Sequence, residues 1–246
     1  MTRRRWGVVI GLLALAAACA GPAPSASAPA ASNSATASGG TQSASPTPLD
    51  IPPGVTLLRD GTLRSGVTYA TPHFAIPFTV TVPTSTPDRF WFATSTSLTR
   101  AIAIGDPEAE GSGIAFYLPT GGFNGDGSPA PLPADFVTWL EHDPQLSASQ
   151  PRAVSVGGRP ATQLDVAAIP GEISAVPGLC PAHLSCVLVA STTPEAPLQP
   201  LLIYPGIPQR VIVVDVDGGQ LLIDIQPDVV VRRPAQRLLA SLQFLH

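Results

Sequence analysis

Three cysteines are the residues of this 246-residue chain whose positions most directly suggest chemistry. Cys180 and Cys186 lie six positions apart in a stretch rich in Pro and Gly, and such a pair in an exported protein usually forms a disulfide. Closing so short a loop would stabilise the fold by about 2 kcal/mol. Two alternatives stay open: free thiols, or a metal site that adds His183, although this spacing matches no common zinc motif. We expect the disulfide and no metal or other cofactor.

Cys19 follows a short apolar leader. Three arginines, Arg3–Arg5, precede thirteen uncharged residues, 6–18, which end in three alanines. Spanning a bilayer takes about 20 residues, so this run has the length of a signal-peptide core rather than of an anchor. The order of apolar run, small residues and cysteine resembles the lipobox of bacterial lipoproteins, and the resemblance implies that the Cys19 thiol carries a diacylglycerol after cleavage.

The leader has two other interpretations. An ordinary signal peptide could be cut after the small residues, with Cys19 incidental. The adjacent arginines would also suit twin-arginine export. We expect residues 1–18 to be a lipoprotein signal peptide and Cys19 to be the lipidation site. The protein would then be anchored at the extracytoplasmic face of the cell membrane.

Two carboxylates, Asp215 and Asp224, form the other candidate site. If Gly218-Gly219 is a two-residue hairpin turn, paired residue numbers sum to 437. The two aspartates then lie diagonally on one face, with Cβ atoms about 7 Å apart. Such a pair could act in acid–base chemistry or bind a cation. The alternative is a solvated acidic face that opposes edge-to-edge pairing of strands.

The same hairpin predicts a core. Side chains alternate along a strand, so one face carries only aliphatic residues: Ile212, Val214, Val216, Leu221, Ile223 and Ile225. The other face mixes aliphatic residues with the two aspartates. This pattern is typical of an antiparallel sheet with a core side and a partly wet side. A second hairpin turns at Gly157-Gly158, between Val154–Val156 and Thr162–Val166.

Strand signals dominate residues 49–246, which we expect to form a single folded domain. Further strands are expected near residues 55–58, 67–71, 76–82, 89–93, 98–104, 113–118, 185–191 and 200–204. Two helices are predicted, one at Asp135–Glu141 and one within residues 234–245. The second should cover the apolar face of the hairpin. These elements predict an α+β fold, an antiparallel sheet covered by helices.

Several motifs resemble uncharacterised exported lipoproteins of high-GC bacteria. They include Gly66-x-x-Tyr69-x-Thr71 and Trp139-Leu140 followed by His142-Asp143-Pro144. The ending, Leu239 to Phe244, is similar to the close of PsbP-like α/β/α sandwich domains. This resemblance covers residues 63–246 and implies a fold that mostly serves binding and assembly. It carries no catalytic residue over to this chain.

Composition sets the remaining limits. Residues 20–48 contain only small and polar residues with proline, so we expect a disordered tether of Ala, Ser, Pro and Thr between Cys19 and the domain. The net charge is −4, with 13 arginines and 17 acidic residues. Removing residues 1–18 takes away three arginines and no acid, which leaves −7. An acidic domain is a poor nucleic-acid binder.

These observations predict a membrane-anchored binding or interaction module without catalytic activity. Its partner would be another envelope protein or an apolar ligand, besides the membrane itself. No G-x-S-x-G or H-E-x-x-H motif occurs in the chain. The alternatives are a cell-envelope hydrolase whose catalytic residues are dispersed along the sequence, because triads assemble in space, and a purely structural surface protein.

Overall fold

A computed structural model of the protein describes residues 49–84, 92–97, 100–105, 113–171, 180, 185–192, 200–206, 208–226 and 229–245, of which 92–97 and 229–232 are described by their backbone alone. These residues belong to one compact unit, 47–246. The leader, Cys19 and the tether lie outside the described residues.

The central feature is an antiparallel sheet of nine described strands. In spatial order they are β10 (Leu146–Ala148), β12 (Arg159–Ala168), β15 (Gln209–Val216), β16 (Gly219–Ile225), β7 (Gly113–Tyr117), β6 (Ala101–Gly105), β5 (Phe92–Ser97) and β2 (Gly61–Thr62), with β11 (Arg152–Val156) also paired to β12. Every neighbouring pair in this sheet is antiparallel.

Two smaller sheets accompany the central one. The first contains β1 (Thr56–Leu57), β3 (Thr68–Ala70), β4 (Phe78–Thr81) and β17 (Gln243–Phe244). The second contains β14 (Leu201–Ile203), β13 (Val187–Ser191), β8 (Gly121–Phe123) and β9 (Pro129–Ala130). Only β1 and β3 pair in parallel among the described strands.

Helix α1 (Phe136–His142) confirms the first predicted helix to within one residue. Asp135 caps it, because its carboxylate accepts the Thr138 backbone N–H at 2.9 Å. That bond, with a second from the Thr138 hydroxyl, lowers the pKa of Asp135 below its ordinary value. The helix directs Phe136 and Leu140 inward, where both are fully buried.

Helix α2 (Val229–Ala240) differs from its prediction at both ends. It begins five residues earlier than expected, so Pro234 lies inside the helix and not in its first turn, although Pro removes a helical donor. The last residues predicted as helix instead form β17, where Gln243 pairs with Thr79 and Phe244 with Phe78.

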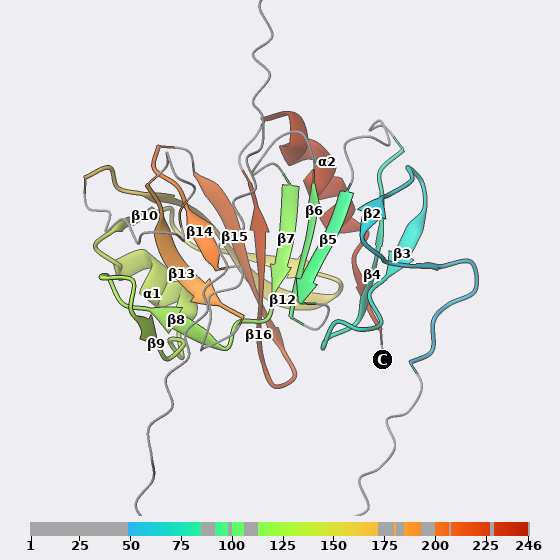
Figure 1. The fold of residues 1–246 in the computed structure, drawn as a ribbon, viewed down its shortest axis with the longest axis horizontal. Coiled ribbons are helices and arrows are strands. Elements are labelled where there is room, and N and C mark those ends of the chain that lie inside the picture. The colour runs from blue at the N-terminus through green and yellow to red at the C-terminus, as the bar shows by residue number, and fades with distance from the viewer. Residues whose placement is uncertain are drawn as a thin grey trace, which may run out of the picture. The chain divides into compact units, whose positions relative to one another are not determined.

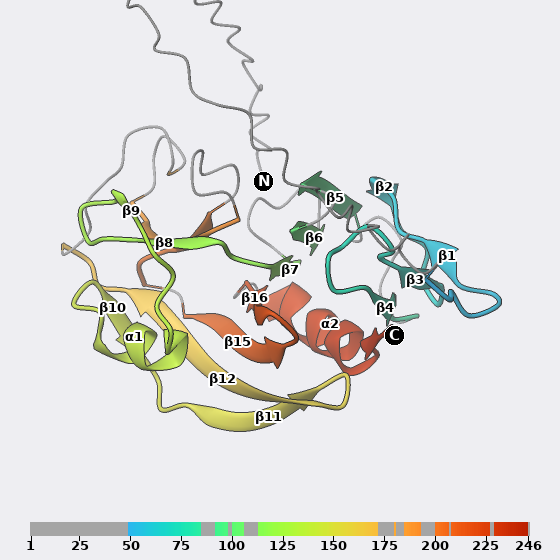
Figure 2. The ribbon, with the colours of Figure 1, turned by 90° about the horizontal axis from the view of Figure 1, so that it is seen from below.

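Each face of the central sheet is covered by one helix and one small sheet. The first core joins Ile212, Val214 and Ile223 to Leu238 of α2 and Phe78 of β4. The second core lies on the opposite face and joins side chains of β12, β15 and β16 to those of α1, β13 and β14. Figures 1 and 2 show α1 with β8, β9, β13 and β14 on one side of the central strands, and α2 with β3 and β4 on the other. The strand-rich α+β fold with an antiparallel sheet is therefore confirmed.

The β15–β16 hairpin corrects one prediction. Val214 pairs with Leu221, so paired numbers sum to 435 rather than 437, and the turn is Asp217-Gly218. A shift of two residues preserves the alternation of side chains. The predicted apolar face is therefore right, while the partners across the hairpin are wrong.

The β11–β12 hairpin turns at Gly157-Gly158, as predicted, with Val156 paired to Arg159. Both glycines have positive φ, 57° and 82°, as a two-residue turn of this kind requires. A Cβ atom on Gly157 would also lie 2.8 Å from side-chain carbons of Leu242 and Phe244. The tip of this hairpin thus packs directly on the C-terminal strand.

Candidate functional site

Asp224 lies in the second core rather than on a wet surface. On β16 it pairs with Val211 of β15 on one side and with Ala115 of β7 on the other. Alternation sends Ile223 and Ile225 to the first core, so Asp224 faces the second, together with Leu222. Its exposed fraction is 0%.

Burial sets the electrostatics of this carboxyl group. Desolvation raises the pKa of Asp224 to about 7, and a smaller effect of Gln226 opposes the rise. Within the described part of the chain, neither carboxyl oxygen has a hydrogen-bond partner of good geometry. Leaving a buried acceptor unpaired costs about 1–3 kcal/mol, and more when the group is charged. A carboxyl group held in this state needs a physical explanation.

Gln209 is the second buried polar side chain at this end of the sheet. It begins β15, where Arg210 pairs with Ile225, and is 0% exposed. Among the described residues, neither its amide oxygen nor its amide nitrogen has a hydrogen-bond partner. Gln209 precedes Val211, the partner of Asp224, by two residues, so it shares a face with Asp224. The two Cβ atoms are diagonal neighbours about 7 Å apart. We call these two residues the Asp224–Gln209 cluster.

Two tyrosines share the environment of the cluster. Tyr117 pairs with Leu222, next to Asp224 on the same face. The phenol oxygen of Tyr117 is buried, although the residue as a whole is partly exposed. Burial raises the pKa of Tyr117 well above its ordinary value, and the negative charges of Asp224 and Tyr204 add to this. The Tyr117 hydroxyl thus lies close to the buried carboxyl group, and Tyr204 lies near Tyr117.

Small residues of β7 and β6 lie next to the cluster in the central sheet. Asp224 pairs with Ala115, which pairs with Ala103, and one row further on Gly113 pairs with Gly105. A Cβ atom on Gly113 would meet the backbone of β6, so only glycine fits there. Ala115 is 7% exposed, yet it belongs to neither core cluster of described side chains. We call these four residues the Ala/Gly floor.

The predicted acidic face does not exist. Asp215 pairs with Gln220 and is exposed, whereas Asp224 is buried opposite Val211. Four residues separate these positions along β15, which is about 13 Å. The shifted register removes the diagonal contact, and the cover of α1, β13 and β14 makes this side of the sheet a core rather than a wet surface.

The structure confirms the disulfide between Cys180 and Cys186, whose Cα atoms are 5.8 Å apart. Cys186 is fully buried immediately before β13. Oxidised sulfurs neither bind a metal nor act as thiols, so both alternatives for this pair are wrong in this structure. His183 lies outside the described residues.

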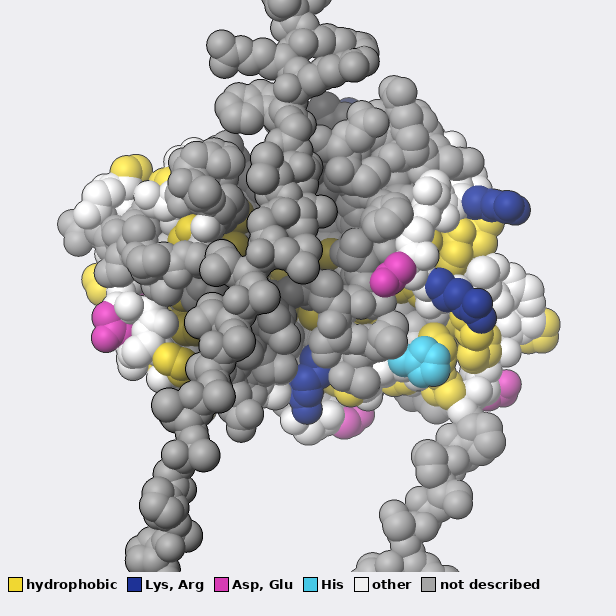
Figure 3. All heavy atoms as spheres, viewed as in Figure 1, with side chains coloured by type: hydrophobic (Ala, Val, Ile, Leu, Met, Phe, Trp, Pro, Cys, Tyr) yellow, Lys and Arg dark blue, Asp and Glu magenta, His cyan; other side chains and the backbone are white. Residues whose placement is uncertain are grey.

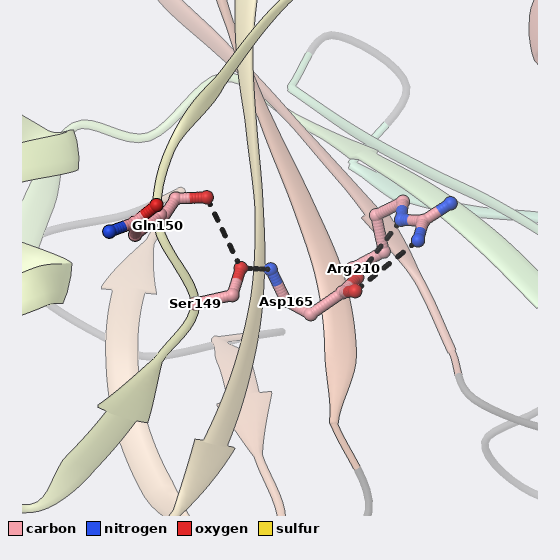
Figure 4. Close-up of polar contacts among 4 residues, drawn as sticks. All are labelled: Ser149, Gln150, Asp165 and Arg210. Atoms are coloured by element: carbon pink, nitrogen blue, oxygen red, sulfur yellow. Dashed lines mark hydrogen bonds and ion pairs between the residues drawn. The ribbon is translucent and has the colours of Figure 1, made fainter.

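A second polar group lies on the other face at the same end of the sheet (Figure 4). Arg210 donates two hydrogen bonds to the Asp165 carboxylate, at 2.9 and 3.3 Å. The Ser149 hydroxyl accepts the Asp165 backbone N–H at 2.9 Å. Residues 149–151 form a bulge there, because they face only two residues of β12. This group is satisfied internally, unlike the Asp224–Gln209 cluster.

Sequence reasoning did not single out Gln209 or Tyr117 as site residues. Strand alternation could have pointed to Gln209. It lies on the same face of β15 as Val211 and Val213, whose side chains are buried. Within the described ranges, no three His, Cys, Asp or Glu side chains are arranged to hold a metal ion. In the same ranges, no helix has the length and apolar character to cross a membrane. No protein-family model and no curated protein sequence matches this chain.

Proposed function

We propose that the protein is a lipid-anchored extracytoplasmic binding module that takes a small polar ligand at the Asp224–Gln209 cluster. One observation carries the binding role: two fully buried side chains on one face of the sheet together carry four polar atoms that have no hydrogen-bond partner among the described residues. Buried polar groups in native proteins are normally hydrogen-bonded. A ligand with matching polar groups supplies those bonds and offsets the desolvation cost.

The anchor in this proposal rests on the sequence of the leader. Cys19 follows the apolar run and three alanines, as in a lipobox. On the face drawn in Figure 3, the described acidic and basic side chains are scattered and form no large patch of either sign. Such a surface gives little electrostatic attraction to anionic lipid. Acyl chains on Cys19 would therefore supply the attachment, at about 0.8 kcal/mol for each buried CH₂.

We also propose that the fold resembles PsbP-like α/β/α sandwich domains. An antiparallel sheet between two covers, each with one helix, supports it, as does the ending at Leu239–Phe244. Each cover here also contains a four-stranded sheet of described residues, in addition to its helix. The binding roles of that fold agree with a ligand site inside the sandwich.

The test of anchoring is intact-mass analysis of the full chain produced in a bacterium that processes lipoproteins. Cleavage before Cys19 and the added mass of a diacylglycerol thioether are expected in the membrane fraction. Cys19→Ser should abolish the lipid mass and release the protein, while Cys180→Ser serves as the matched control. A Cys19→Ser product that is still lipidated and membrane-bound would refute the anchor.

The test of binding is a melting-temperature screen of the processed chain, in detergent, against small polar compounds. A compound that binds the folded state raises the melting temperature in a concentration-dependent way. A true ligand of the cluster should lose this effect in Asp224→Leu. Hits that are unaffected by Asp224→Leu and by Gln209→Leu would refute this site.

A second candidate function is a hydrolase in which Asp224 is the general acid. The observation that favours it is the pKa of about 7, close to the operating pH of a general acid. Turnover of envelope ester, glycoside or peptide substrates that disappears in Asp224→Asn would establish this candidate. Binding without turnover would establish the first.

A further inference from the structure

We propose that the ligand of the Asp224–Gln209 cluster carries a protonated amine, which the Asp224 carboxylate receives as its counter-charge. This inference rests on the proposed binding function and names the chemical class of its ligand. Three sets of observations support it: the acceptors at the cluster, the charges around it, and the small residues beside it.

The acceptors match an ammonium group. Asp224 offers two oxygens and Gln209 one amide oxygen, all without hydrogen-bond partners. The phenol oxygen of Tyr117 lies in the same environment. An ammonium group has three N–H donors and no acceptor. Aromatic rings such as that of Tyr117 also attract cations. An anionic ligand would meet a carboxylate, and is disfavoured.

No described positive charge neutralises Asp224. Its pKa responds to burial and to Gln226, and no cation contributes. Arg210 points to the opposite face of the sheet, where it pairs with Asp165 at 2.9 Å. The titratable group that faces Asp224 from β7 is Tyr117, whose raised pKa keeps it neutral at pH 7, and Tyr204 after β14 lies near Tyr117. A ligand cation would be the missing counter-charge.

A metal ion fits less well than an amine. The cluster contains a single carboxylate, whereas calcium takes six to eight oxygen ligands. An organic cation needs only a few acceptors and space for its carbon body. The Ala/Gly floor would leave more room for that body than larger side chains would, because Ala115 and Ala103 have only methyl groups and Gly113 and Gly105 have no side chain. The net charge of −4 also attracts cations to the protein.

Binding and proton release are linked in this arrangement. The empty cluster holds the carboxyl group partly protonated near pH 7, because burial disfavours the charge. An ammonium ion stabilises the ionised form, so binding should lower the pKa of Asp224 and release a proton. Affinity should therefore rise with pH between 5.5 and 8.5, up to the pH at which the amine itself loses its proton.

The experiment is calorimetric titration of the processed chain with n-butylammonium chloride, and with n-butanol as the uncharged probe. We expect millimolar or tighter binding of n-butylammonium at pH 8, at least tenfold weaker binding at pH 5.5, and no detectable n-butanol binding. Asp224→Asn keeps the shape of the side chain and removes its charge, so it should weaken n-butylammonium binding at least tenfold. Asp215→Asn, the exposed aspartate of β15, is the matched control and should bind as the unchanged protein does.

A second measurement does not depend on any variant folding. Carbon-13 NMR of the carboxyl group follows the pKa of Asp224 directly, and n-butylammonium should lower that pKa. The proposal of an amine ligand would be overturned if Asp224→Asn bound n-butylammonium as tightly as the unchanged protein does. An unchanged pKa of Asp224 at saturation would overturn it as well. Binding of n-butanol that requires Gln209 would overturn the proposal of an amine ligand but preserve the proposed binding function. If neither probe binds and the wider compound screen finds no ligand of the cluster, both the proposal of an amine ligand and the proposed binding function are refuted.

Discussion

The two faces of the central sheet are covered alike and yet differ in chemistry. The first core is entirely apolar where α2 packs on it, and Phe116 lies 4.8 Å from Phe78 between ring centroids. The second core contains the Asp224–Gln209 cluster among its aliphatic side chains. Strand alternation alone makes this difference, because adjacent residues of β16 face opposite cores.

The comparison separates the requirements of stability from those of function. An apolar core gains free energy from burial alone, and the first core follows that rule throughout. A fully buried carboxyl group without a partner weakens the fold, and proteins keep such groups mainly at functional sites. The first core therefore serves the fold, and the second serves both the fold and the proposed site.

The largest expected effect tests the first core. Phe116→Ala should lower the free energy of unfolding by about 4 kcal/mol, because it leaves a cavity beside Phe78 in a site with 0% exposure. Urea unfolding followed by circular dichroism measures the change. Leu57→Ala, at an exposed position, should change the stability by less than about 0.5 kcal/mol. Equal effects of the two substitutions would contradict the assignment of Phe116 to a core that stabilises the fold.

The second prediction concerns the pH dependence that Asp224 gives to the second core. Its pKa is about 7 in the folded state, above the ordinary value of 3.8, so the folded state holds the proton more tightly. That stabilisation is complete below about pH 4 and is lost as the pH rises through 7. The loss amounts to at most about 4 kcal/mol.

Urea unfolding between pH 4 and pH 8 measures this contribution. Asp224→Asn should flatten the decline in stability over this range and should be most favourable, relative to the unchanged protein, at pH 8. Asp215→Asn should leave the decline unaltered, because Asp215 is exposed. The burial argument fails if the pH profiles of Asp224→Asn and the unchanged protein run parallel.

The disulfide should have the next largest effect. Replacing both Cys180 and Cys186 by Ala should lower the free energy of unfolding by about 2 kcal/mol, since the loop they close is short. The melting temperature in calorimetry reports the change, and the effect should fall on the second core, which includes Val187 of β13. A melting temperature that does not change would show that the bridge adds nothing to stability.

The smallest expected effect belongs to the Asp165–Arg210 pair. Its side chains are 33% and 17% exposed, so Asp165→Asn should cost about 0.5 kcal/mol. The difference between the variant and the unchanged protein should shrink in 1 M NaCl, where screening is strong. A cost above about 2 kcal/mol, unaffected by salt, would show that this pair stabilises the fold as a buried ion pair does.

Strand alternation made the first core predictable from sequence. The aliphatic residues of β15 and β16 fall on one face in either register, so the error of two positions in the turn did not affect them. The turn itself was ambiguous, because Asp217-Gly218 and Gly218-Gly219 are both favourable two-residue turns. Only pairing across the sheet distinguishes them.

The site depended on contacts that lie far apart in the sequence. Asp224 is buried because α1, β13 and β14 cover its face of the central sheet. No local pattern in the sequence of β16 predicts that these elements cover it. Helix α2 was predicted too short because Pro is favoured in a first helical turn, whereas Pro234 lies inside the helix. Gln243 and Phe244 were predicted as helix because the apolar stripe of α2 continues into them, although they pair with β4.

The bulge beside Ser149 affects how copies of this protein would meet. β10 and β11 form the outer edge of the central sheet, and residues 149–151 interrupt that edge with a proline at Pro151. An unbroken edge would invite another chain to add a strand, which is how aggregates grow. If the proposed anchor holds copies of the protein side by side on a lipid surface, this broken edge would oppose strand pairing between them.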